Sequence, residues 1–107
     1  MPLRIPRVVV RVGPGPTWKS GLPEEQPGWD AHAEFVDNLI ERGLFIMGGP
    51  WSNRLGSLSI WEGMTAEEVR AIVEEDPFVL NGVFEVEDIA DWTVYVDTRI
   101  EWSLPRR

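Results

Sequence analysis

The order of strand-like and helix-like segments predicts a single α+β domain for this 107-residue chain. Runs of β-branched and aromatic residues mark four strands, and apolar residues at three- and four-residue steps mark two helices. The segments follow each other as β-α-β-β-α-β. That order is typical of the split βαβ, ferredoxin-like fold, in which a four-stranded antiparallel sheet carries two helices on one face.

The first strand is expected over residues 4–12, because Val8, Val9 and Val10 are consecutive there. A continuous apolar run of this kind favours a central place in the sheet. Residues 13–28 follow as a loop rich in proline and glycine, with Trp18 and Leu22 as side chains that it can bury. The loop is long for a compact domain, so we expect a lid or a contact between subunits.

The first helix is expected over residues 29–43. Its apolar face carries Trp29, His32, Ala33, Val36, Leu39 and Ile40. His32 is the only histidine of the chain, and its place on the buried stripe means that it needs a hydrogen-bond partner.

Residues 44–47 and 54–61 read as two strands of a hairpin. Between them, Gly48, Gly49 and Pro50 indicate a turn or bulge where the backbone can approach a ligand closely. We therefore expect Gly49 and Pro50 to contribute to a binding site.

The second helix is expected to begin after Thr65, since residues 65–68 form a capping box. Its other end breaks a rule, because Glu74, Glu75 and Asp76 are expected at the negative end of the helix dipole. Pro77 ends the helix there and holds Asp76 on a rigid corner. A solvated turn residue is the simpler interpretation of Asp76, and a satisfied, half-buried side chain is the simpler interpretation of His32.

The last strand is expected over residues 83–96, with a bulge at Ala90–Asp91. The tail over residues 98–107 is too apolar for a free end, so packing on a partner subunit or an added edge strand is expected. With both helices on one face, the other face of the sheet has no cover within one chain. An apolar face of this kind marks an interaction surface, and a homodimer with the two sheets packed face to face is the simplest solution.

The composition excludes several classes of function. A net charge of −8 repels phosphate backbones, so no nucleic acid is expected as a partner. There is no cysteine and one histidine, so no metal site is expected, and no dinucleotide, haem or phosphate-loop motif points to a cofactor. No apolar run approaches a membrane span and no signal-peptide core is visible, so a cytoplasmic protein is expected.

Residues 29–96 resemble the YciI-like, YCII-related family of small dimeric α+β barrel proteins. The resemblance is carried by His32, the Gly-Leu-Phe-Ile-Met-Gly-Gly-Pro stretch at 43–50, the Asp-Pro-Phe stretch at 76–78 and Gly82. It implies a pocket between the first helix and the sheet with a catalytic pair, here His32 and Asp76. It also implies enzyme-like chemistry, of the lyase or dehydrochlorinase type on hydroxylated aromatic molecules in some relatives, and proton-transfer chemistry in related isomerase-like barrels.

The residues allow that chemistry without a cofactor, because a neutral imidazole accepts a proton near neutral pH and a carboxylate orients it. Trp51, Phe78 and Trp92 are candidate walls for a flat small-molecule ligand. Ser52 is a candidate for binding an oxyanion, with Asn53 and Arg54 as alternatives. Two functions stay open, a lyase or isomerase acting through His32 and Asp76, and a non-catalytic binding or assembly module with the same pocket.

Overall fold

The structure is a computed structural model that describes residues 5–51 and 56–99 of the chain. In chain order the elements are β1 (Ile5–Pro14), η1 (Pro23–Glu25), α1 (Trp29–Glu41), β2 (Phe45–Pro50), β3 (Ser57–Glu62), α2 (Ala66–Val73), α3 (Pro77–Leu80) and β4 (Phe84–Val94). The sequence did not predict the two short helical elements η1 and α3. Apart from them, the order is the expected β-α-β-β-α-β.

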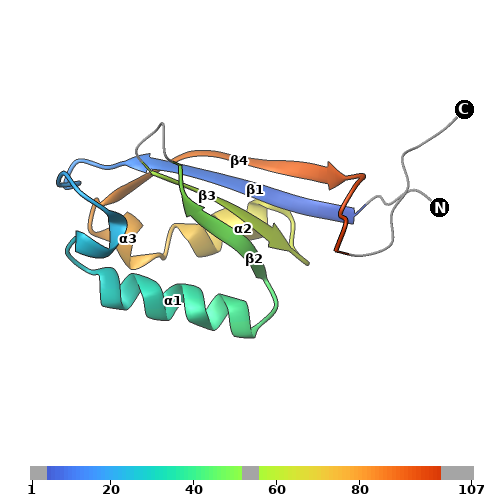
Figure 1. Cartoon of the computed structure of the whole chain (residues 1–107), viewed down its shortest axis with the longest axis horizontal. Helices are drawn as coiled ribbons and strands as arrows, with labels where there is room; N and C mark the ends of the chain where they lie inside the picture. Colours follow the sequence, from blue (N-terminus) through green and yellow to red (C-terminus); the bar gives the residue numbers. More distant parts are fainter. Residues whose placement is uncertain (1–4, 52–55, 100–107) are drawn as a thin grey trace, which may run out of the picture.

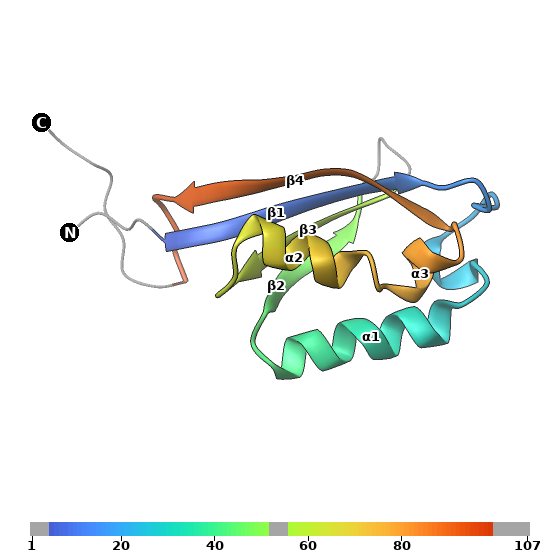
Figure 2. The ribbon, with the colours of Figure 1, turned by 180° about the vertical axis from the view of Figure 1, so that it is seen from behind.

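The four strands form one antiparallel sheet in the order β2-β3-β1-β4. Both long helices lie on the same side of this sheet, as the two opposite views show (Figures 1 and 2). This is the ferredoxin-like α+β arrangement, so the predicted fold class and the central place of β1 are confirmed. Val8, Val10 and Val12 point to the helices and form the core with buried residues such as Val69 and Phe78.

Two strands run further than the sequence indicated. β1 continues to Pro14, and β2 includes the Gly48-Gly49-Pro50 stretch that we expected to be a turn or bulge. Gly48 and Gly49 pair with Ser59 and Leu58 of β3, so their backbone is part of the ladder. The β2–β3 hairpin is confirmed, although β3 begins only at Ser57.

The irregularity of β4 lies at a different residue from the predicted one. Arg11 pairs with Asp88 and Val12 pairs with Val86, which leaves Glu87 as the extra residue of a bulge. Ala90 pairs regularly with Val9, so the predicted bulge at Ala90–Asp91 is wrong. An imperfect alternation in the sequence shows that a strand is irregular, but the partner strand decides where the extra residue goes.

The segment between β1 and α1 is held by hydrogen bonds to the turn before β4. Gly15 N donates to Val83 O at 2.8 Å, and Thr17 N donates to Gly82 O at 3.0 Å. Within the segment, the buried Gln26 side chain bonds both backbone groups of Lys19. These contacts tie the segment to the start of β4. Its expected role as a lid or as a contact between subunits stays a prediction.

The side chains of this segment are buried unequally. Trp18 stacks on Phe84 with ring centroids 6.1 Å apart, but Leu22 is 54% exposed. Leu22 is therefore not buried within this chain, and its burial under a lid or against another subunit stays a prediction.

We call the side of the sheet that faces away from the helices the open face. Residues of β1 between the core valines point to it, and their cross-strand partners share it. Its apolar members are Val9, Met47, Leu58, Ile60, Ala90 and Trp92. The predicted homodimer through this face stays a prediction.

In the part of the chain that the structure describes, no helix is long and apolar enough to cross a membrane.

Candidate active site

Asp76 begins a helix and does not end one. We expected the second helix to run to Asp76, but α2 ends at Val73 and Asp76 is the N-cap of α3. Its Oδ1 accepts a hydrogen bond from Phe78 N at 2.8 Å, and Pro77 occupies the first helical position. A carboxylate and a following proline are preferred at these two positions, so the local sequence fixes Asp76 in place.

His32 of α1 meets this carboxylate across 44 residues of sequence. Nδ1 of His32 lies 2.8 Å from Oδ1 and 2.9 Å from Oδ2 of Asp76. The two side chains are only 14% and 12% exposed. Because a carboxylate only accepts hydrogen bonds, Nδ1 carries a proton, and in the neutral imidazole Nε2 is then an acceptor. The sequence analysis proposed that these two groups can meet, and the structure brings them together.

Aromatic rings fix the plane of the His32 imidazole. Phe78 stacks on it with centroids 4.2 Å apart and planes at 8°, while Phe84 meets it edge-on at 5.7 Å. The ring of Trp29 lies 5.6 Å away on the same helix. Phe78 is fully buried, and it does not line the cavity described next. Its expected place as a cavity wall is therefore corrected, because Phe78 supports the histidine from behind.

A cavity of about 400 Å³ lies between α1 and the sheet, and His32 is on its wall. The apolar stripe of α1 faces this cavity, and Leu39 is the residue of that helix that is buried. Most of the lining is apolar. The polar lining residues are Glu24, His32, Asp37, Ser57, Ser59 and Asp76. No lysine or arginine lines the cavity among the residues described.

The other expected binding residues are divided between two places. Gly49 and Pro50 line the cavity, as expected. Trp51 does not line it, and instead borders a shallow hollow on the open face together with Met47. Trp92 lies on the open face and is 44% exposed, so it is no cavity wall either. Ser52, with Asn53 and Arg54, lies outside the described residues.

The sequence analysis missed two serines on the sheet wall of the cavity. Ser57 and Ser59 pair with Val12 and Val10, so they point to the helices like these core valines. Ser59 Oγ accepts a hydrogen bond from Trp61 Nε1 at 2.9 Å, and Ser57 Oγ donates one to Gly49 O at 2.8 Å. The alternation of residues 57–61 was a visible signal, but only the register with β1 shows which side is the inner one.

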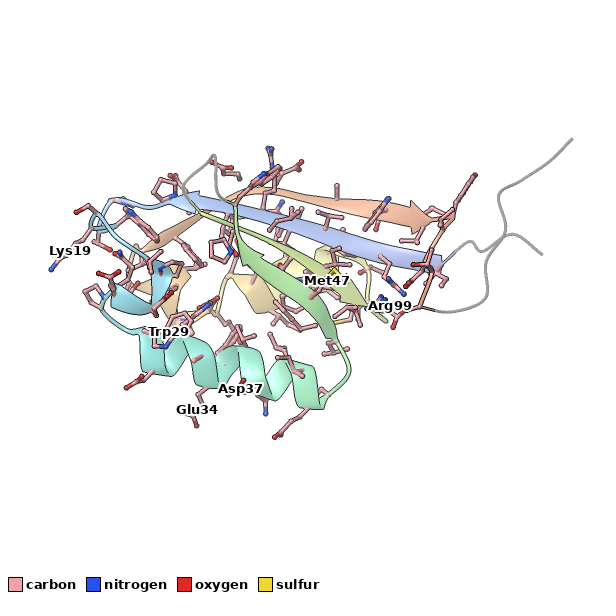
Figure 3. All side chains as sticks on the ribbon, in the orientation of Figure 1. Lys19, Trp29, Glu34, Asp37, Met47 and Arg99 are labelled. Carbon is pink, nitrogen blue, oxygen red and sulfur yellow. The ribbon has the colours of Figure 1, made fainter. Side chains whose placement is uncertain are left out.

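The charges at the cavity are acidic apart from the histidine. Glu24 of η1 and Asp37 of α1 are exposed at its edge, and Figure 3 shows Trp29 and Asp37 on the same helix. Glu34 points away from the sheet. Within residues 5–51 and 56–99, no group of three or more histidine, cysteine or acidic side chains is arranged to hold a metal ion.

The fold is shared with a solved enzyme structure. It is 5-chloro-2-hydroxyhydroquinone dehydrochlorinase from Burkholderia phenoliruptrix, in complex with 2,5-dihydroxybenzoquinone, and the TM-score is 0.60. The match covers 82% of this chain and 93% of the dehydrochlorinase, at 24% sequence identity. A likeness at that identity shows a common fold. A search of the curated proteins found no match.

The sequence itself matches a family model. The model of the YCII-related domain matches residues 15–93, a span that begins just after β1 and ends within β4. It includes α1 with His32, the β2–β3 hairpin and the Asp76 cap of α3. This span is well over half of the chain, and the protein therefore belongs to the YCII-related domain family.

Proposed function

We propose that this protein is a cofactor-free enzyme that uses His32 and Asp76 for general acid/base chemistry on a small, hydroxylated aromatic or enol-containing molecule. The observation that carries the proposal is the bond from His32 Nδ1 to Asp76, which leaves Nε2 available to a molecule in the cavity. Geometry of this kind is the first requirement for a general base.

The proton transfer follows from the arrangement of the pair. Nε2 accepts a proton from a hydroxyl or an acidic carbon of the substrate, and the imidazolium that forms is stabilised by Asp76. Asp76 also accepts from Phe78 N, so it is held while the charge on the histidine changes. The stack with Phe78 keeps the ring from rotating away. Positioned acid/base groups contribute about 10²- to 10⁴-fold to a rate.

The reaction class we favour is that of a lyase, for example a dehydrochlorinase, with an isomerase as the other form of the same proton-transfer chemistry. The protein with the shared fold is named as a dehydrochlorinase and was solved with a dihydroxybenzoquinone. A flat ring of that kind suits a cavity with mostly apolar walls, such as Phe45, Trp61 and Phe84. We extend the family resemblance to the substrate class on these grounds.

The test is a turnover assay over chlorinated and unchlorinated hydroquinones, with release of chloride and change in ultraviolet absorbance as readouts. The wild type should turn over at least one compound, and His32→Asn and Asp76→Asn should lower the rate by about 10²- to 10⁴-fold. Glu34→Gln, on the solvent side of α1, is the matched control and should keep the wild-type rate.

The alternative is a binding or assembly module that holds a small molecule without turning it over. It is favoured by the small number of polar groups in the cavity. Tight binding of a hydroquinone with no turnover in the wild type would support this alternative and contradict the enzyme proposal. Calorimetric titration of the same compounds distinguishes the two.

A further inference from the structure

The short helix α3 is attached to α1 at both of its ends. At the N-terminal end, the Asp76 carboxylate lies 2.8 Å from Nδ1 of His32. At the C-terminal end, Nδ2 of Asn81 donates a hydrogen bond at 3.0 Å to the carbonyl oxygen of Pro27, just before α1 begins. Both views place α3 beside the start of α1 (Figures 1 and 2). The two hydrogen bonds therefore hold the same pair of helices at two points.

The side chain of Asn81 is held from two sides. Its Oδ1 accepts a hydrogen bond from Val83 N at 3.1 Å, while its Nδ2 donates to Pro27 O. These partners fix the orientation of the amide, because an N–H needs an oxygen and a carbonyl needs an N–H. The backbone of Asn81 is also bonded, since its N–H donates to Pro77 O at 3.0 Å and its carbonyl accepts from Thr17 Oγ1 at 2.8 Å.

The residue between Pro27 and α1 leaves room for this contact. Gly28 is the N-cap of α1 and has a φ of 91°, a conformation that glycine adopts without strain. A Cβ on Gly28 would lie 2.7 Å from Nδ2 of Asn81. A side chain there would push the amide away from Pro27 O, so the close approach of α3 to the start of α1 depends on this glycine.

The ring of Phe78 lies between the two attachment points. It stacks on His32 with centroids 4.2 Å apart, and its centroid is 6.1 Å from that of Trp29. Contacts between rings are favourable over a range of offsets. A hydrogen bond is more directional, because it weakens steeply once its angle falls below about 120°. The hydrogen bonds at the two ends, more than the rings between them, therefore determine how α3 is oriented on α1.

We propose that Asn81 is a positioning residue for the His32–Asp76 pair, and that it acts through its hydrogen bond to Pro27. Asn81 does not line the cavity, so its effect on the pair passes through α3 and the start of α1. Without the bond, α3 turns about its remaining contacts, and the Asp76 carboxylate moves away from Nδ1. The importance of this for catalysis rests on the proposed function of the pair.

The tautomer of His32 reports on this geometry. Because Asp76 accepts the proton of Nδ1, it favours the neutral tautomer that carries its proton on that nitrogen. When the carboxylate moves away, the tautomer with its proton on Nε2 gains population. The ¹⁵N chemical shifts of the two ring nitrogens measure this ratio at alkaline pH, and they are unambiguous because the chain has one histidine.

The experiment compares these ¹⁵N signals in the wild type, Asn81→Ala and Asn81→Asp. Alanine removes both side-chain hydrogen bonds of Asn81. Aspartate keeps an acceptor for Val83 N but has no N–H for Pro27 O, so the loss that the two variants share is the bond to Pro27. In both we expect the ratio of the Nε2–H to the Nδ1–H tautomer to rise by about 2- to 10-fold, as for the loss of one hydrogen bond. Asn81 is exposed, so both variants should fold.

Thr17→Val is the matched control. It removes the hydroxyl that binds the carbonyl of Asn81, so it loses one exposed hydrogen bond at the same turn and keeps the bond to Pro27. Its tautomer ratio should equal that of the wild type. Gly28→Ala tests the bond from the side of α1, because its methyl group displaces the Asn81 amide, and it should raise the ratio as the two Asn81 variants do.

The inference is overturned if both Asn81 variants keep the wild-type ratio, or if Thr17→Val changes it as much as they do. A change in Asn81→Asp alone would be an effect of the added charge, and a change in Asn81→Ala alone would assign the role to the bond with Val83. Either result would also contradict the inference.

The tautomer measurement needs no substrate, so it separates this inference from the proposed function. If the hydroquinone assay finds turnover, both Asn81 variants should lower kcat by about 2- to 10-fold while Thr17→Val keeps the wild-type rate. Turnover with no change in the tautomer ratio of the variants would overturn the role of Asn81 alone. A changed ratio in a protein without turnover would support the positioning of the pair and contradict the enzyme proposal.

Discussion

The two faces of the sheet are built from the same strands but differ in the side chains that they carry. On the covered face, Val8 and Val10 support a cavity that contains the His32–Asp76 pair and Ser59. On the open face, the residues in between, such as Val9, line up with apolar partners. The hollow there is lined by apolar side chains and glycine and proline backbone, with no titratable group among the described residues.

The comparison teaches that strand alternation separates the proposed catalytic face of the sheet from the proposed assembly face. Ser57 and Ser59 of β3 face the cavity, and Leu58 and Ile60 between and after them face outward. A change of one residue in register would therefore exchange the side chains of the two faces. The open face also contains a buried polar atom without a hydrogen bond among the described residues. Nε of Arg11 is buried, and it has no hydrogen-bond partner in the described part of the chain.

The largest expected effect is on the covered face, at Phe78. This ring is fully buried and supports the His32 imidazole, so Phe78→Ala should lower the free energy of unfolding by about 3–5 kcal/mol. Urea unfolding measures it. Leu80→Ala, on the same helix but 72% exposed, is the control and should cost less than about 0.5 kcal/mol. If Phe78→Ala does not fold, Phe78→Leu tests the same contact, and equal costs for Phe78→Leu and Leu80→Ala would contradict the model of the site.

The open face is tested at Ile60, which lies between Val9 and Met47. A charge at the centre of a buried apolar interface is expensive, so Ile60→Asp should weaken dimerisation by about 100-fold or more. Sedimentation velocity over a range of micromolar concentrations measures the change from dimer to monomer. Leu80→Asp, on exposed α3, should leave the dimer intact. A wild type that sediments as a monomer at every concentration would rule out the proposed dimer.

A smaller effect separates the two roles of Asp76. Asp76→Ala removes both the cap of α3 and the partner of His32, and the loss of the cap alone should cost about 0.5–2 kcal/mol. Asp76→Asn retains a good capping residue, so its cost should be smaller, while the His32 ¹⁵N signals should still change. Thr65→Ala removes the cap of α2 and should cost as much as the loss of the α3 cap without moving those signals. If the His32 signals ignore Asp76→Asn, the pair is not coupled.

The sequence predicted the fold because its local signals agree with one another. The capping box at Thr65, the valine run of β1 and the helical stripe with His32 each point to one element, and the alternating order leaves one arrangement of the sheet. His32 and Asp76 were recognisable as a pair because the chain has a single histidine and because Asp76 precedes a proline in an unusual run of acids.

The role of Asp76 as a helix start and the inward side of β3 were not predicted, because they depend on tertiary contacts that no local sequence pattern contains. Asp76-Pro77 is a helix start as well as a helix stop, and only the position of Phe78 under His32 shows which of the two matters for the site. The inner face of β3 was not readable because Leu58 and Ile60 are more apolar than the serines that point inward. Hydrophobicity alone would place those serines on the solvent side of the sheet, but in the structure they line the cavity.

The smallest expected change in stability is at one end of the open face, where charged side chains form ion pairs. Arg7, opposite Trp92, bonds Glu62 at 3.0 Å and approaches Asp97 at 3.7 Å. Asp97 also forms a two-pronged pair with Arg99, which lies at the opposite end of the molecule from Lys19 (Figure 3). The hydrogen bond from the Arg99 side chain holds the pKa of Asp97 well below its usual range.

A lowered pKa in the folded state stabilises the fold above the pKa of the unfolded chain, about 4 for aspartate, and this stabilisation is lost as the pH falls further. Asp97→Asn should therefore destabilise the protein slightly at pH 7 and equally at pH 5, and the difference should shrink below about pH 4. Urea unfolding of both proteins across this range measures it, with the exposed Asp91→Asn as the control. A difference that grew as the pH fell would mean that Asp97 destabilises the fold in its charged form, which would contradict the stabilising role of its pair with Arg99.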